Sequence, residues 1–114
     1  MRTLLLITLC VLPVSAGIDD AYAERLVNIL YICEGGPKAR VPYGILSVKV
    51  RSAAEARAVC KRTVVNTYQR WEDGGRKGDF IVSLCLRYCP PSVDKVGHSN
   101  LIRNVRYYVN KETK

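Results

Sequence analysis

The fold is decided by residues 33–48, which read CEGGPKARVPYGILSV. The pair Gly35-Gly36 is typical of a helix end, because glycine readily adopts the left-handed conformation of a C-terminal cap. Pro42 excludes a helix that continues through the segment, since proline lacks a backbone N–H and clashes with the preceding turn. The run at 45–50, rich in β-branched residues, predicts a short strand. This stretch therefore separates a first helix from the rest of the chain by an irregular segment with one small β element.

Helices are predicted on both sides of this segment. Before it, apolar residues recur at three- and four-residue intervals, which predicts a helix over 20–33 that Asp19 or Asp20 can cap. After it, the capping box at 52–55 (Ser-Ala-Ala-Glu) opens a long helix, and the glycines at 74–75 end it.

Two shorter helices follow. Asp79 is expected to cap a third helix that Pro90-Pro91 closes, and Ser99 to cap a fourth. The predicted class is mainly α: four helices, one short β element after the first helix, and disulfides that staple them. Their buried faces are expected to hold Leu26, Ile29, Leu30 and Cys33, then Ala56, Val59, Cys60, Thr63, Val64, Thr67 and Trp71, then Phe80, Ile81, Leu84 and Tyr88, and last Leu101, Ile102, Val105 and Val109.

The first 16 residues resemble a secretory signal. Arg2 supplies a positive charge, residues 4–14 are apolar, and the small residues at 14–16 (Val-Ser-Ala) suit a signal peptidase that cuts after Ala16. The apolar run is too short to cross a bilayer as a helix, which takes about 20 residues. A buried N-terminal helix is the alternative. We therefore expect a signal peptide at 1–16, a single domain at 17–114, and a secreted or periplasmic protein.

Removal of the signal leaves four of the five cysteines, an even number that favours two disulfides in an exported chain. Four cysteines allow three pairings. Cys85 and Cys89 are expected one turn apart on a helix, so they are predicted to reach different elements, as Cys60–Cys89 and Cys33–Cys85. A zinc site is the alternative, but the chain has no CxxC pair and one histidine, His98.

The chain is strongly basic. Without Arg2 it carries 17 Lys and Arg against 10 Asp and Glu, a formal charge of +7. Such a surface suits a polyanion, although simple solubility explains the charge equally well. Export argues against nucleic acid and leaves an anionic membrane or an acidic cell-wall polymer.

Glu34 is the candidate catalytic residue. It is expected at the end of the first helix, where the negative end of the helix dipole and an apolar wall both disfavour its charge. Both effects raise the pKa of the carboxyl, as a general acid near neutral pH requires. The alternative is a solvated residue at a helix end beside a turn.

A helix that ends in Glu34, followed by a loop and the run Tyr43-Gly44-Ile45-Leu46-Ser47, resembles the lysozyme-like fold, and within it the one-acid lytic transglycosylases and goose-type lysozymes. Gly44-Ile45-Leu46-Ser47 is similar to the family's cleft-floor motif, with Ser47 where Gln is frequent. Arg87-Tyr88-Cys89-Pro90 is the best match to the family's third motif, and residue 35 is Gly where Ser is common.

The resemblance implies cleavage of the β-1,4 bond between N-acetylmuramic acid and N-acetylglucosamine by one carboxyl. Glu34 would be the general acid and Tyr88 would hold it by a hydrogen bond. Tyr43, Ser47 and Asn104 would line the sugar subsites. No cofactor or metal is implied, the partner is the peptidoglycan glycan strand, and the protein is expected to be a monomer.

Two rival interpretations remain. The first is a non-catalytic exported cationic module that binds cell wall or inhibits an enzyme, for which Glu34 is unnecessary. The second is a membrane-active toxin acting through basic helices. The helix stripes are typical of core-facing faces, which places the toxin third.

Overall fold

The computed structural model describes residues 17–39, 43 and 51–112, with the side chain of residue 112 left out. Within these ranges the protein is helical and contains no strand: α2 (Asp20–Cys33), the short 3-10 turn η1 (Gly36–Lys38), α3 (Ala53–Asp73), α4 (Phe80–Tyr88) and α5 (Lys95–Glu112). The mainly α class is confirmed. The strand predicted at 45–50 lies outside the described residues, as does the signal at 1–16.

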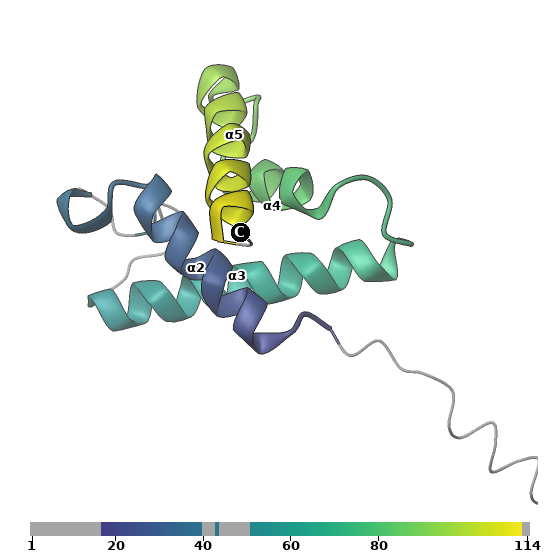
Figure 1. The fold of residues 1–114 in the computed structure, drawn as a ribbon, viewed down its shortest axis with the longest axis horizontal. Helices are drawn as coiled ribbons and strands as arrows, with labels where there is room; N and C mark the ends of the chain where they lie inside the picture. The colour runs from purple at the N-terminus through teal and green to yellow at the C-terminus, as the bar shows by residue number, and fades with distance from the viewer. Residues whose placement is uncertain (1–16, 40–42, 44–50, 113–114) are drawn as a thin grey trace, which may run out of the picture.

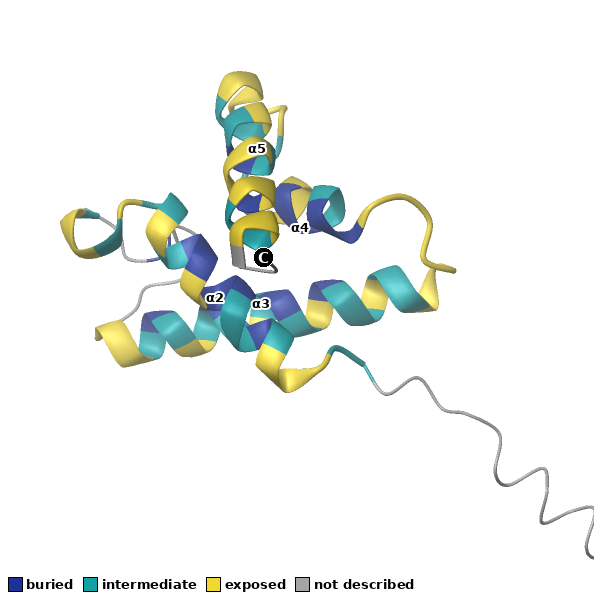
Figure 2. Ribbon diagram, viewed as in Figure 1, coloured by how far each residue is buried: buried dark blue, intermediate teal, exposed yellow. Residues whose placement is uncertain are grey.

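The helices pack in a closed ring of neighbours. α2 and α4 each pack against both α3 and α5. Figure 1 shows α5 upright in the view, with its C-terminal end close to the place where α2 crosses α3 and with α4 beside it. The dark blue faces in Figure 2 turn toward one another between the helices. This core consists of Ala23, Leu26, Val27, Ile29, Leu30, Tyr43, Ala56, Cys60, Val64, Phe80, Ile81, Leu84, Cys85, Leu101 and Val105.

Three predicted helix starts are confirmed by their caps. The side chain of Asp19 accepts a hydrogen bond from the Tyr22 N–H (3.1 Å), and the Ser52 hydroxyl accepts one from the Glu55 N–H (3.1 Å). The Asp79 carboxylate accepts one from the Ile81 N–H (2.8 Å). Each short polar side chain satisfies a backbone donor that has no partner within its helix.

The predicted start of the last helix is wrong. α5 begins at Lys95, not after Ser99, because the Asp94 carboxylate accepts a hydrogen bond from the Gly97 N–H (2.8 Å) and its carbonyl accepts one from His98 (2.9 Å). Asp94 therefore caps the helix.

The four cysteines of the described chain are free thiols, so neither predicted disulfide is formed in this structure. Cys60 and Cys85 are buried, and Cys33 and Cys89 are half-buried. The Cys89 thiol lies 3.9 Å from the carbonyl oxygen of Asp94 rather than beside Cys60. The described side chains form no group of three His, Cys, Asp or Glu that is able to hold a metal ion. No described helix is long and apolar enough to cross a membrane.

Candidate active site around Glu34

Glu34 is the residue that ends α2. Its backbone N–H donates to the Leu30 carbonyl (2.9 Å), and Gly35 follows with φ = 109°, a conformation that glycine adopts without strain. Burial raises the pKa of the half-buried Glu34 carboxyl. No described cation or hydrogen-bond donor contacts this carboxyl to offset the burial.

Every other described carboxylate side chain has a hydrogen-bond or ion-pair partner, whereas Glu34 has none among the described residues. Asp19, Asp79 and Asp94 cap helices, and Glu55 accepts a hydrogen bond from the Arg51 N–H at the start of α3. The rest bond basic or amide side chains: Asp20 and Glu24 with Lys61, Glu72 with Arg76, and Asp73 with Gln69. A half-buried carboxyl without a partner is the kind of group whose proton is available for chemistry near neutral pH.

Tyr88 is brought to Glu34 by the end of α4. Burial raises the pKa of the Tyr88 hydroxyl far above its usual value, and the charges of Cys60, Glu34 and Tyr43 act in the same direction. The hydroxyl oxygen is fully buried and completes no hydrogen bond of normal geometry with a described residue, although the Cys60 thiol lies beside it. The expected hydrogen bond from Tyr88 to Glu34 is therefore not formed here, but the two groups are electrostatic neighbours.

Tyr43 is held over the same end of α2. Its side chain is 6% exposed, and its ring lies 5.1 Å from the Tyr31 ring, centroid to centroid. The backbone φ of Tyr43 is 59°, in the left-handed region that costs a non-glycine residue about 1–3 kcal/mol and is found mostly where function requires it. The Arg57 guanidinium donates to the Tyr43 hydroxyl at 3.5 Å.

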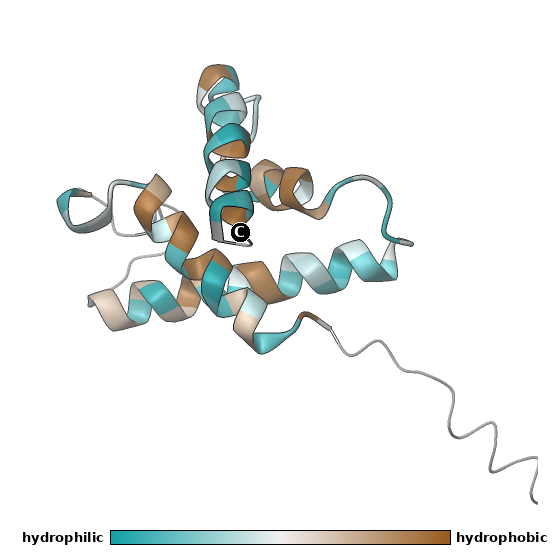
Figure 3. Ribbon diagram, in the orientation of Figure 1, coloured by the Kyte–Doolittle hydropathy of each residue, from teal (hydrophilic) through white to brown (hydrophobic). Residues whose placement is uncertain are grey.

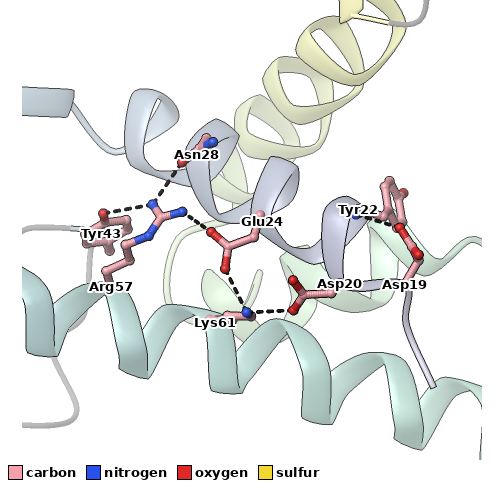
Figure 4. A network of polar contacts seen from close by, with 8 residues as sticks. All are labelled: Asp19, Asp20, Tyr22, Glu24, Asn28, Tyr43, Arg57 and Lys61. Carbon is pink, nitrogen blue, oxygen red and sulfur yellow. Dashed lines mark hydrogen bonds and ion pairs between the residues drawn. The ribbon is translucent and has the colours of Figure 1, made fainter. Parts of the chain in front are cut away.

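A polar network between α2 and α3 fixes that guanidinium. Figure 4 shows Arg57 donating to the carboxylate of Glu24 and, at 2.8 Å, to the side-chain oxygen of Asn28. Lys61, one turn further along α3, lies 2.7 Å from both Asp20 and Glu24. The network therefore sets the relative position of Tyr43 and the helix that ends at Glu34.

Sequence reasoning missed this network, although a signal was present. Asp20 and Glu24 are four residues apart, as are Arg57 and Lys61, so each pair lies on one face of its helix. Two such faces of opposite charge on adjacent helices attract each other. The sequence did not show that α2 and α3 pack with those faces together.

The other predicted site residues do not join this cluster. Asn104 is exposed on α5 and makes no hydrogen bond with a described residue. Ser47 lies outside the described residues. Glu34 and Tyr43 both act electrostatically on the Tyr88 hydroxyl, so three separate segments contribute to one neighbourhood, which also includes the Cys60 thiol.

The chain was compared with protein-family models, with curated proteins and with solved structures. No family model, no curated protein and no solved structure matches it.

Proposed function

We propose that the protein is an exported enzyme that cleaves the β-1,4 glycosidic bond of peptidoglycan, with Glu34 as its single general acid. The observation that carries the proposal is the state of that carboxyl: half-buried, without a described partner, and with a pKa that burial raises. Such a group keeps its proton to higher pH and delivers it to a leaving oxygen without breaking an ion pair first.

In the proposed reaction the Glu34 carboxyl protonates the glycosidic oxygen as the bond from that oxygen to C1 of the muramyl residue breaks. The 6-hydroxyl of the same sugar then attacks C1 and returns its proton to the Glu34 carboxylate, which leaves an anhydro product and regenerates the acid. If water attacks in place of the 6-hydroxyl, the product is a reducing end. Each other described carboxylate side chain is engaged elsewhere, which favours a scheme with one acid.

Tyr88 and Tyr43 have supporting roles in this proposal. Tyr88 is a positioning residue: its hydroxyl has no hydrogen-bond acceptor among the described residues and would acquire one in the Glu34 carboxylate. Tyr43 would contact the sugar beside the acid. Ser47 and Asn104 stay predictions for the subsites, as do the monomeric state, the peptidoglycan partner and the exported location.

The disulfides also remain a proposal. Burial and, after it, the electrostatic effect of Cys33 raise the pKa of the Cys85 thiol, so these two thiols interact. Both are free in this structure, and a bond between α2 and α4 would require their sulfurs to approach each other. After export, exchange with an oxidising disulfide would take two electrons and two protons from this pair. The Cys60–Cys89 pair lacks this support and stays a prediction from the sequence.

The function is tested by incubating residues 17–114 with purified peptidoglycan and identifying soluble fragments by mass spectrometry. The wild-type chain is expected to release muropeptides with anhydro or reducing ends. Glu34→Gln should lower release by 10²-fold or more, because general acid catalysis contributes about 10²–10⁴ in rate. Glu55→Gln removes an equal charge, keeps a side chain able to accept the Arg51 N–H, and should leave release unchanged.

Tyr88→Phe tests the positioning role. It should lower release less than Glu34→Gln does and shift the alkaline limb of the pH profile, because the hydrogen bond to the carboxylate is lost. Equal release by the wild type and Glu34→Gln, or no release from any wall preparation including deacetylated glycan, would refute the enzyme proposal.

A further inference from the structure

A surface hollow of about 290 Å³ lies at the C-terminal end of α3, where this helix faces α4. It is separate from the Glu34 site. Helix α3 carries one residue of each region. Cys60 is near the Glu34 site, since the Glu34 charge raises its pKa in part, and Trp71 is in the wall of the hollow. At a rise of 1.5 Å per residue, they lie about 16 Å apart along the helix axis. The walls are formed by Thr67, Arg70, Trp71, Gly74, Lys77 and Ser83.

Two cations in these walls lack counterions. Arg70 and Lys77 are exposed, and neither forms an ion pair or side-chain hydrogen bond with a described residue. Lys61 is paired with Asp20 and Glu24, and Arg76 with Glu72, whereas Arg62 of α3 is exposed without a described partner but lies outside the hollow. Two unpaired cations on one concave surface attract an anionic group more strongly than either does alone. Figure 3 shows this end of α3 as the more hydrophilic one.

Thr67 supplies an independent sign of a ligand. A threonine inside a helix commonly bonds the carbonyl four residues earlier, as Thr63 does with Val59 at 3.0 Å. Thr67, one turn further, is 7% exposed, and its hydroxyl has no hydrogen-bond partner among the described residues. A buried hydroxyl without a partner costs about 1–3 kcal/mol. The oxygen itself is closed to solvent, but Thr67 lines the hollow, so a rotation about its Cα–Cβ bond that turns the hydroxyl into the hollow would let a bound molecule supply the partner.

Trp71 gives the hollow a rigid apolar wall. Its indole N–H donates to the Gly78 carbonyl (3.2 Å). Its ring packs against Tyr68 and Phe80 with centroids 5.3 Å and 5.6 Å apart, and the Arg76 guanidinium lies over the ring, 5.5 Å from its centroid. An ordered aromatic wall beside hydroxyls and cations is a lining suited to a sugar, which presents apolar C–H groups, hydroxyls and, where it is acidic, a negative charge.

We propose that this hollow is a second binding site, for an anionic saccharide. Arg70 and Lys77 hold the acid group, Trp71 contacts the carbons of the ring, and Thr67 and Ser83 bond the hydroxyls. The site rests on its own residues and does not require Glu34 to be catalytic. If Glu34 acts on a wall polymer, this second site, further along α3 from Cys60, binds another part of the same polymer.

The test measures binding by calorimetry in a Glu34→Gln chain, which rules out turnover of the probe. The probes are a muramyl disaccharide with its lactyl carboxylate, a glycerol-phosphate oligomer, and an uncharged N-acetylglucosamine oligomer of similar length. Arg70→Gln/Lys77→Gln should weaken binding of an acidic probe by tenfold or more. Arg62→Gln/Lys95→Gln lowers the net charge equally at exposed positions outside the hollow and should change the Kd by less than about twofold, as expected for weak long-range screening. Preference for the carboxylate or for the phosphate identifies the polymer.

Thr67→Val is the second variant. It should weaken binding of the same probe several-fold without lowering the Tm, because it removes a hydroxyl that the folded chain leaves without a partner. The proposal is overturned if both double variants weaken binding equally, if the uncharged oligomer binds as tightly as the acidic ones, or if no probe binds. None of these results depends on whether the wild type cleaves peptidoglycan.

Discussion

At the scale of the residue, two glutamates of α2 have opposite electrostatic environments. Burial raises the pKa of Glu34, whereas hydrogen bonds from Lys61 and Arg57 lower the pKa of Glu24. A raised carboxyl pKa stabilises the fold below the unfolded value, and this contribution is lost as the pH rises through the folded value. A lowered pKa does the reverse. It stabilises the fold above the unfolded value, and this stabilisation is lost as the pH falls through the folded value.

These environments predict opposite effects of two matched substitutions. Glu34→Gln should raise the Tm at pH 7 and leave it unchanged well below pH 4, because the unfolded carboxyl has a pKa of about 4.3. Glu24→Gln should lower the Tm at pH 7 and lose its effect in the same acidic range. Thermal unfolding between pH 3 and pH 8 checks both. If Glu34→Gln lowers the Tm at pH 7, the carboxylate has a stabilising partner and is not poised as an acid.

The position of Glu34 could be predicted from the sequence, but its surroundings could not. Gly35 and the preceding apolar stripe identify a helix that ends at this residue, and the structure confirms that end. The position of Tyr88 near Glu34 depends on how α4 packs against α3 and α5. The local sequence pattern does not predict this packing. The same holds for Thr67: its place on the buried face was predicted, while the lack of a partner for its hydroxyl is visible only in three dimensions.

At the scale of the element, helix starts were predictable wherever one polar residue clearly preceded an apolar run. Asp19, Ser52 and Asp79 met this condition. The start of α5 was misjudged because its first turn, Lys95 to His98, has no buried residue and looks like a loop. Ser99 precedes the apolar residues Leu101 and Val105 and so resembles a cap. The helix starts earlier because the Asp94 carboxylate accepts a hydrogen bond from the Gly97 N–H, which has no partner within the first turn.

Asp79 joins two elements, and substitutions can separate its two functions. One carboxylate oxygen caps α4 through the Ile81 N–H, and the other bonds Arg106 of α5 at 2.8 Å. Asp79→Ala should cost about 1–2 kcal/mol, mostly from the lost cap. Asp79→Asn keeps the cap and should cost less than about 1 kcal/mol, because the ion pair is largely exposed.

Urea denaturation of these variants and of Arg106→Gln measures the two contributions. Arg106→Gln removes the ion pair alone and should match Asp79→Asn. The hydrogen bond from Arg106 also lowers the pKa of Asp79, so the stability that it contributes should be present above the unfolded pKa and be lost as the pH falls through the folded value. Equal losses for Asp79→Asn and Asp79→Ala would show that the cap contributes little.

At the scale of the whole molecule, the question is how a chain this small becomes stable. The described core consists of aliphatic side chains together with two aromatic residues, Tyr43 and Phe80, and two cysteines, Cys60 and Cys85. Cores of this size give a thin margin, which small exported domains commonly supplement with disulfides. Burial raises the pKa of Cys33 to about 11 and that of Cys85 to about 12, so few of these thiols are ionised near neutral pH.

Oxidation of Cys33 and Cys85 should therefore be slow at pH 7, faster as the pH rises, and strongly stabilising once complete. A bridge between them closes a loop of roughly 50 residues and should add about 4 kcal/mol in the chain-entropy account. The measurement is the difference in unfolding free energy between oxidised and reduced protein, with the bonded pair identified by peptide mapping. Cys33→Ala/Cys85→Ala should abolish that difference, while Cys89→Ala should retain most of it. A difference that survives the double substitution would assign the stabilising bridge to another pair and leave the end of α2, and with it Glu34, without a covalent link to α4.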